Sequence, residues 1–270
     1  MRDERLDMDR VARWTAILEM LTNVDGGRLT IEQVVKSFNV SPATVRRDFD
    51  ELARQQMLTR TRGGAVSNGV FYDLPLRYKT ARHASEKQRI AEAAVRLLTP
   101  GQVVGLNGGT TTTEVARVLA ARSELLSNGP DAPLTVVTNA LNIANELTMR
   151  PNVKIVVIGG VVRPQSYELT GPLATKLLTD MTLDVAILGV DAIDDATGAS
   201  AHHEGEASIN QLMAARARKV FVVADGSKVG QAAFARIARI QDIDALITDS
   251  TAPAAAVRNI ESAGCRVIQA

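Results

Sequence analysis

A run of small and hydroxyl-bearing residues, Asn107-Gly-Gly-Thr-Thr-Thr-Thr113, follows a short apolar stretch and precedes a helical pattern. Glycines let backbone N–H groups approach a ligand, threonine hydroxyls add donors, and the N-terminus of the following helix favours an anion. The run therefore predicts a phosphate cradle, although a glycine turn with threonine capping explains the same residues. It lacks the Gly-Lys-Thr/Ser of a Walker loop and the G-x-G-x-x-G of a dinucleotide turn.

Polar groups also end four later apolar stretches, at Thr138-Asn139, Gly159-Gly160, Gly189-Val-Asp191 and Asp225-Gly-Ser-Lys228. Ligands of open parallel sheets bind outside the carboxyl ends of the strands, which is where these groups would lie. Lys228 could pair with a phosphate or a sugar hydroxyl, or could be a solvated loop lysine. Glu206, at the start of a helix, could accept hydrogen bonds from hydroxyls or could serve only as a favourable first-turn acid.

Metal ligation and disulfide chemistry have little support in the sequence. His202 and His203 beside Glu204 would suggest a metal site, but the chain has only three histidines and no second pair. We therefore expect no metal and no cofactor. The single cysteine, Cys265, excludes a disulfide or a cysteine zinc cage within one chain.

The segment from Ser41 to Leu52 has the pattern of a helix that reads DNA. Ser41 can cap this helix with its hydroxyl, and Pro42 fits the first helical position. Its apolar stripe consists of Val45, Phe49 and Leu52. The side chains left on the outer side are Thr44, Arg46, Arg47 and Asp50. The early turns of such a helix enter a DNA major groove, where adjacent arginines can pair with phosphates or guanine edges.

Two further helices and a hairpin are predicted around this segment. Residues 8–22 have helical apolar spacing, and Thr30 with Gln33 forms a capping-box signature ahead of a second helix. Residues 57–66 alternate up to a glycine pair, which predicts a wing. Arg60 and Arg62 would share one face of its strand and reach the phosphate backbone. A helical oligomerisation domain with solvated arginines is the alternative interpretation.

The remainder of the chain alternates apolar runs with helical patterns, which predicts a mostly parallel, Rossmann-like sheet covered on both faces. The expected strands are Val103–Leu106, Thr135–Val137, Lys154–Ile158, Asp184–Leu188, Lys219–Ala224, Ala245–Thr248 and Arg266–Ile268. The expected helices lie near residues 85–98, 112–121, 140–149, 172–179, 206–217 and 252–263. The predicted organisation is a DNA-binding domain at 1–66, a linker at 67–84 and an α/β domain at 85–270.

Composition limits the class of protein. A net charge of +1 argues against non-specific coating of nucleic acid, while an apolar fraction of 46% is ample for a core. The charged first ten residues lack the apolar core of a signal peptide. No run approaches the roughly 20 apolar residues that span a bilayer. We expect a soluble, cytoplasmic protein with no membrane partner.

The whole set of motifs resembles the DeoR family of bacterial transcriptional regulators, from about residue 8 to the C-terminus. The motifs that carry the resemblance are Thr44-Val-Arg-Arg-Asp-Phe49, Arg62-Gly-Gly-Ala65, Asn107-Gly-Gly-Thr-Thr-Thr112, Val137-Thr-Asn139, Ile158-Gly-Gly160, Leu188-Gly-Val-Asp191, Asp225-Gly-Ser-Lys228 and Leu246-Ile-Thr-Asp249. In that family a winged helix-turn-helix precedes a sensor domain similar to ribose-5-phosphate isomerase. Most members are oligomeric repressors of carbohydrate uptake or catabolic operons, controlled by a phosphorylated sugar.

The resemblance implies roles for individual residues. Contacts with double-stranded operator DNA are expected from Ser41, Thr44, Arg46, Arg47, Arg60, Arg62 and Gly63. Contacts with the effector are expected from Gly108, Gly109, Thr110, Thr111, Thr112, Asn139, Gly160, Asp191, Glu206 and Lys228. The chain is expected to form a dimer or tetramer. Ala199-Ser-Ala-His-His203 departs from the leucine-threonine-threonine of many relatives, beside the expected effector.

A sugar-phosphate isomerase with an appended DNA-binding domain is the alternative from another class. Such isomerases carry an Asp-Gly-Ala-Asp strand end, where this chain has Leu188-Gly-Val-Asp191. Because leucine takes no part in acid/base chemistry, Glu206 would be a base without its partners. We therefore expect a retained pocket, no catalytic residues and no enzyme activity.

Overall fold

The computed structural model describes residues 10–24, 27–55, 57–67, 76, 82–122, 125, 134–150 and 152–270 of the chain. The chain divides into two compact units, Met1–Arg82 and His83–Ala270. The predicted linker, residues 67–84, falls mostly outside the described residues. Its last residue, Ala84, is the first residue of the helix that opens the second unit.

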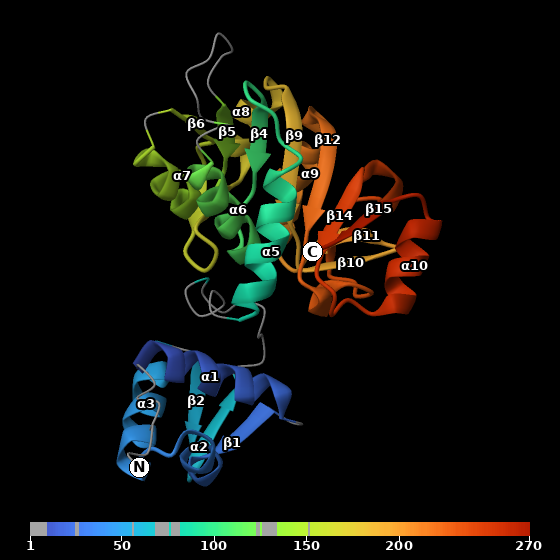
Figure 1. The fold of residues 1–270 in the computed structure, drawn as a ribbon. Coiled ribbons are helices and arrows are strands. Elements are labelled where there is room, and N and C mark those ends of the chain that lie inside the picture. The colour runs from blue at the N-terminus through green and yellow to red at the C-terminus, as the bar shows by residue number, and fades with distance from the viewer. Residues whose placement is uncertain are drawn as a thin grey trace, which may run out of the picture. The chain divides into compact units, whose positions relative to one another are not determined.

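In its described residues, the first unit contains the helices α1, α2 and α3 and a small antiparallel sheet (Figure 1). Its elements are α1 (Arg10–Asn23), β1 (Arg28–Thr30), α2 (Ile31–Phe38), α3 (Pro42–Arg54), β2 (Leu58–Thr61) and β3 (Gly64–Ser67). The strands lie in the order β1-β3-β2. The predicted helix-turn-helix and wing are confirmed, and β1, which was not predicted, adds a third strand. Trp14, Ile17, Leu21, Phe49 and Leu52 are among the side chains of its core.

Local capping explains where α2 and α3 begin. At α2 the Thr30 hydroxyl accepts from the Gln33 backbone N–H, and the Gln33 side chain accepts from the Thr30 N–H at 2.7 Å. At α3 the Ser41 hydroxyl accepts from the Thr44 N–H at 3.1 Å, with Pro42 in the first turn. Both predicted caps are therefore present, and they fix the short turn that separates the two helices.

The two glycines of the wing are required for different reasons. Gly63 has a φ of +87° in the two-residue turn between β2 and β3, with open space around it. Gly64 faces the backbone of β1, where an added Cβ would come within 3.1 Å of the Leu29 carbonyl carbon. Only glycine lets β3 approach β1 this closely.

The second unit is built on a seven-stranded sheet in which every neighbouring pair is parallel. The strand order is β15-β14-β12-β9-β4-β5-β6. Its strands are β4 (Val103–Leu106), β5 (Thr135–Thr138), β6 (Lys154–Val157), β9 (Leu183–Gly189), β12 (Ala217–Val223), β14 (Ala245–Thr248) and β15 (Arg266–Gln269). These are the seven predicted strands, and the predicted fold class is confirmed.

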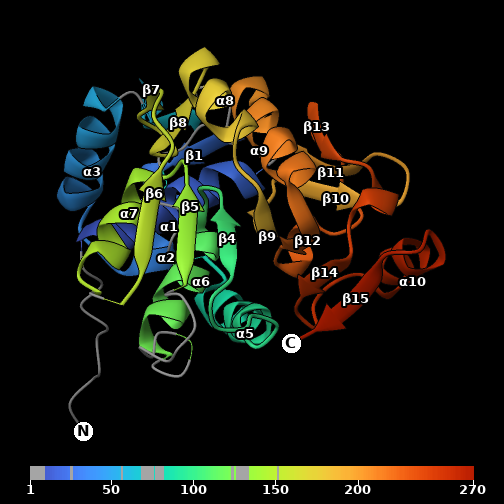
Figure 2. The same ribbon diagram turned by 90° about the horizontal axis from the view of Figure 1, so that it is seen from above.

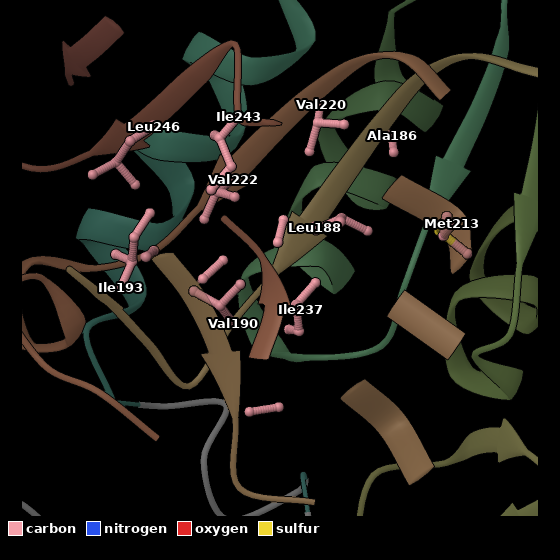
Figure 3. Packing of buried hydrophobic residues seen from close by; sticks show 14 of the residues in the cluster. Ala186, Leu188, Val190, Ile193, Met213, Val220, Val222, Ile237, Ile243 and Leu246 are labelled. Carbon is pink, nitrogen blue, oxygen red and sulfur yellow. The ribbon is translucent and has the colours of Figure 1, made fainter. Parts of the chain in front are cut away.

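Helices cover both faces of this sheet, α5 and α6 on one side and α8 and α9 on the other (Figure 2). The helices are α5 (Ala84–Val95), α6 (Thr110–Ala121), α7 (Leu141–Thr148), α8 (Pro172–Thr179), α9 (Glu204–Arg216) and α10 (Ala254–Ser262). The unit has a hydrophobic core on each face of the sheet, and alternate side chains of β9 point into one or the other. Val185 and Ile187 pack with α5 and α6 in the first core, whereas Ala186 and Leu188 pack with α8 and α9 in the second core. Figure 3 shows Leu188 among the buried side chains of the second core.

Cys265 also lies in the second core and is 1% exposed. Burial raises the pKa of its thiol to about 11. The thiol is therefore protonated at neutral pH and unreactive, as expected of a buried structural cysteine.

Short strands outside the main sheet were not predicted. They are the hairpin of β7 (Val161–Arg163) and β8 (Glu168–Thr170), and the small sheet of β10 (Ala192–Asp194), β11 (Gly198–Ala201) and β13 (Ala235–Ala238). The described residues also form the single turns η3 (Gly226–Lys228) and η4 (Ile240–Asp242). The chain passes from the edge strand β6 through the hairpin and α8 to β9, on the far side of β4. The ends of β4 and β9 therefore form the switch point at which ligands of such sheets bind.

Candidate functional site

Asn107 joins the two strand ends at the switch point. Its side-chain Nδ2 donates to the Gly189 carbonyl at 2.8 Å, and its Oδ1 accepts from the Gly189 N–H at 2.8 Å. The side chain is 1% exposed. Asn107 thus satisfies both backbone groups of Gly189 and fixes the position of the loop in which the cradle was predicted.

The predicted cradle is the N-terminus of α6. Gly109, with a φ of +127°, is the N-cap and provides no side chain, so the first-turn N–H groups lack a capping group. The hydroxyls of Thr112 and Thr113 donate to the Gly109 carbonyl at 3.2 and 2.6 Å. Thr111 is 2% exposed and its hydroxyl has no partner among the described residues. The cradle therefore offers the backbone N–H groups of the first turn of α6, and the partly exposed Thr110 and the buried Thr111 add hydroxyls.

Asn139, at the end of β5, was predicted to contact the effector and lies beside this cradle. Its Nδ2 donates to Glu168 Oε2 at 3.0 Å and to the Leu169 carbonyl at 3.4 Å. Its Oδ1 is fully buried and has no partner within the described parts of the chain. A buried amide oxygen without a donor is costly, and a ligand hydroxyl would satisfy it.

Glu168, on β8, is a site residue that the sequence reasoning missed. It is 4% exposed, and an added Cβ on Gly108 would lie 2.6 Å from its carboxyl carbon. Burial raises the pKa of Glu168 to about 8, and the charges of Glu206 and Asp191 add to the effect. Hydrogen bonds from Asn139 and the Gly108 backbone oppose the shift. At neutral pH the buried carboxyl is therefore mostly protonated.

Glu206 and Gly160 have neighbours that the sequence did not indicate. Arg163 Nη1 on β7 donates to Glu206 Oε1 at 3.1 Å, so the hairpin is tied to the start of α9. The Glu206 N–H also donates to His203 Nδ1 at 3.3 Å. Gly160 packs at the base of the hairpin, where a Cβ would lie 3.1 Å from the Thr170 nitrogen. Gly160 therefore has a structural reason to be glycine, whether or not it contacts a ligand.

Lys228 and Asp191 connect the loops that follow β12 and β9. Lys228 is partly buried, and its Nζ donates to the Val190 carbonyl at 2.7 Å, so it is not a solvated loop lysine. Asp191 accepts from the His202 N–H at 2.9 Å. Burial acts to raise the pKa of the Asp225 carboxyl, but the Lys228 ammonium and the hydrogen bond from Ser227 together hold this pKa below its usual value. The polar groups of β4, β5, β9 and β12 thus follow the carboxyl ends of four neighbouring strands.

The helix that was predicted to read DNA, α3, has the expected side chains on its two sides. Val45, Phe49 and Leu52 are fully buried, and Arg46 and Arg47 are exposed on the other side of α3. Thr44 is partly exposed, and its hydroxyl is 2.9 Å from that of Ser41. The Ser41 side chain is thereby used as a cap.

The predicted pair of wing arginines needs correction. β2 ends at Thr61, so Arg62 belongs to the turn with Gly63 and does not share a strand face with Arg60. Arg60 lies against Asp50 at 2.8 Å, donates to the Gly64 carbonyl at 2.9 Å and stacks over Phe49. Arg60 therefore links the wing to α3. These contacts use the guanidinium that was expected to face phosphate.

A buried acid, Asp48, holds α3 against α1. Asp48 is 4% exposed and accepts from Trp14 Nε1 at 2.8 Å and from Arg13 Nε at 2.6 Å. The sequence placed Asp48 between two outward-facing positions of α3, and its role was not predicted. The network links α1 to α3, the helix that carries Arg46 and Arg47.

Among the described residues no helix combines the length and apolarity needed to cross a membrane. Within the same residues no group of three or more His, Cys, Asp or Glu side chains is arranged to hold a metal ion.

Comparisons with known proteins match both units. Residues 13–70 match the DeoR-like helix-turn-helix domain, and residues 82–250 match the DeoR C terminal sensor domain. The HTH-type transcriptional regulator GlpR of Haloferax volcanii is 35% identical over 253 residues, covering 93% of this chain and 94% of that protein. The glycerol-3-phosphate regulon repressor of Escherichia coli K12 is 30% identical, covering 91% and 93%. Ribose 5-phosphate isomerase A of Methanocaldococcus jannaschii aligns over 54% of each chain, with 18% identity and a TM-score of 0.40.

Proposed function

Because the chain belongs to the DeoR family of transcriptional regulators, we propose that it represses a carbohydrate uptake or catabolic operon under the control of a phosphorylated sugar. The observation that supports control by an effector is the arrangement of groups at the switch point, where β4 and β9 end. There the uncapped N-terminus of α6 lies beside two buried oxygens, on Asn139 and Thr111, that have no partner in the described part of the chain. Donors for an anion next to an acceptor for a hydroxyl suit a sugar phosphate.

The proposed ligand contacts follow from this arrangement. The phosphate lies at Gly108–Thr112, and the sugar lies toward Asn139, Asp191 and Lys228. The name of the Escherichia coli relative points to glycerol 3-phosphate as one compound to test. Glu206 enters as a ligand only if its ion pair with Arg163 opens or is shared.

On the DNA side, the proposal places α3 in the major groove with Arg46 and Arg47 at phosphates or guanine edges. Arg62 and Gly63, at the tip of the wing, lie next to the DNA backbone. A homo-oligomer, a dimer or a tetramer, presents two such units at half-sites about one helical turn apart. The protein acts in the cytoplasm, and no cofactor takes part.

Control requires that the effector bind one arrangement of the protein better than the other. A 100-fold change in DNA affinity corresponds to about 2.7 kcal/mol of coupling between the two sites. Two charge-assisted hydrogen bonds to the effector phosphate, made in only one arrangement, are sufficient for this.

The isomerase alternative is tested by a direct assay with ribose 5-phosphate and related aldose phosphates. Leu188 is fully buried among apolar side chains of the second core, so it brings no acid/base group to the strand end. We expect no turnover. Turnover faster than about 1 s⁻¹, a low rate for an enzyme, would show that the protein is an isomerase and would overturn the proposed function.

Replacing Arg47 with alanine is expected to abolish sequence-selective DNA binding. The full-length protein first selects fragments from its genomic DNA, and affinity for the selected site is then measured at fixed salt. We expect at least about a 10-fold loss from one bidentate base contact, more if Arg47 also orients α3. Arg218→Ala removes the same charge from an exposed position of the second unit and should leave DNA affinity unchanged. Equal affinities for the two variants would contradict the role of α3.

Replacing Lys228 with alanine is expected to give a protein that binds DNA but no longer responds to the effector. The side chain is the cation at the end of β12, and its hydrogen bond positions the loop that carries Asp191. The measurement is release of the selected DNA across a panel of sugar phosphates, including glycerol 3-phosphate. Lys219→Ala, at an exposed position on the same strand, is the matched control. A normal response from the Lys228 variant would remove this lysine from the site.

A further inference from the structure

The hairpin of β7 and β8 carries a carboxyl group into the cradle. The backbones of Glu168 and Ala140 form an isolated antiparallel β-bridge. On either side of it, the Leu169 N–H donates to the Asn139 carbonyl at 2.7 Å, and the Leu141 N–H donates to the Tyr167 carbonyl at 3.0 Å. These backbone contacts fix the hairpin beside the end of β5. The Glu168 side chain is consequently held against Gly108, the first glycine of the cradle.

The position of this carboxyl matters because Gly108, against which it lies, directly precedes Gly109, the N-cap of α6. An anion seated at the start of α6 would lie beside the same group. Two negative charges cannot share so small and buried a space without a large electrostatic penalty. A neutral carboxyl has no such penalty, and it can donate its proton to a ligand oxygen.

We propose that Glu168 is a specificity-determining residue of this site, and that a divalent oxyanion binds the cradle only when the Glu168 carboxyl carries a proton. The inference rests on the proposed function, because it takes the cradle to be the phosphate subsite. The ligand class is a phosphate monoester or another dianion, and its oxygen accepts a hydrogen bond from the protonated Glu168.

The charged groups around Glu168 favour this protonated state. Glu206, from α9, and Asp191, from the loop after β9, both disfavour a negative charge at Glu168. The cation of the hairpin, Arg163, is paired with Glu206. His203 accepts a hydrogen bond at Nδ1 from the Glu206 N–H, and the one charged residue of α8, Lys176, is exposed.

The sign of the pH dependence follows from the raised pKa. Below about pH 8 the carboxyl is protonated and the cradle accepts a dianion. Above this pH the ionised carboxylate repels it. If binding requires the protonated form, affinity at pH 9 should be about tenfold lower than at pH 7.

The experiment measures binding of sulfate to the full-length protein by isothermal calorimetry between pH 7 and pH 9. Sulfate is the probe because its charge is constant over this range, so any pH dependence belongs to the protein. Glu168→Gln keeps the shape of the protonated acid and cannot ionise. Glu204→Gln, an exposed acid at the start of α9, is the control. Measurements in two buffers of different ionisation enthalpy give the number of protons taken up with the anion.

Between pH 7 and pH 9, the sulfate affinity of the wild type and of the Glu204 variant is expected to fall roughly tenfold, whereas that of Glu168→Gln should not change. Wild-type protein should take up close to one proton per sulfate at pH 9, and Glu168→Gln none. The same pH dependence in all three proteins, or no proton uptake by the wild type, overturns the role of Glu168 and leaves the proposed function intact. If neither sulfate nor any sugar phosphate binds at any pH, the cradle is absent and both proposals are wrong.

Discussion

Replacing Asp48 with alanine is expected to unfold the DNA-binding unit while the α/β unit remains folded. The change removes the buried carboxylate that accepts hydrogen bonds from both Arg13 and Trp14 Nε1. Removing one partner of a buried ion pair typically costs about 3–5 kcal/mol. A domain of this size has a small core and little stability to spare, so a loss of that magnitude approaches its whole free energy of unfolding.

Trp14 makes this prediction easy to measure, because it is the only tryptophan of the chain and lies in the first unit. Its fluorescence during urea unfolding reports on that unit, and selective DNA binding should disappear together with the folded signal. Asp50→Ala is the control, since its ion pair with Arg60 is exposed and worth at most about 1 kcal/mol. A fluorescence midpoint for Asp48→Ala equal to that of the control would show that the network is not stabilising.

Replacing Asn107 with alanine should have the largest effect on the second unit. The variant loses two buried hydrogen bonds and leaves both backbone groups of Gly189 unsatisfied. We expect the free energy of unfolding of this unit to fall by about 2–4 kcal/mol. Anion binding should also be lost, because the strand ends are no longer held in register. Far-ultraviolet circular dichroism during urea unfolding measures the cost, since the unit contains no tryptophan.

Asn142→Ala is the matched control for Asn107. Its side chain donates one hydrogen bond, to the Thr113 hydroxyl at 2.8 Å, and is partly exposed. Its removal should cost no more than about 1 kcal/mol. If the two variants were equally stable, the ends of β4 and β9 would be held by the sheet alone.

The sequence predicted the main sheet and the DNA-binding unit because their signals are local. Continuous apolar runs that alternate with helical spacing identify buried parallel strands. The caps at Thr30 and Ser41 were visible as residue types at fixed offsets. The hairpin of β7 and β8 was missed because three-residue strands leave too short a pattern for alternation to be recognised.

The side chains that were missed depend on contacts between distant parts of the chain. Asp48 lies in a charged stretch of α3, and its burial follows only from the approach of Arg13 and Trp14. Glu168 has the appearance of a surface acid, and the sequence does not indicate that a hairpin carries it to Gly108. The neighbours of Arg60 were missed for a related reason, because its partner Asp50 comes from the neighbouring helix. The contact of Arg60 with DNA stays a prediction.

The buried thiol of Cys265 has a practical consequence for studying how the two units communicate. Because the native cysteine is 1% exposed and protonated at neutral pH, it should not react with maleimide dyes in the folded protein. One cysteine introduced on the surface of each unit would then carry the only two fluorophores. Energy transfer between them would follow the separation of the units directly while DNA and effector are added.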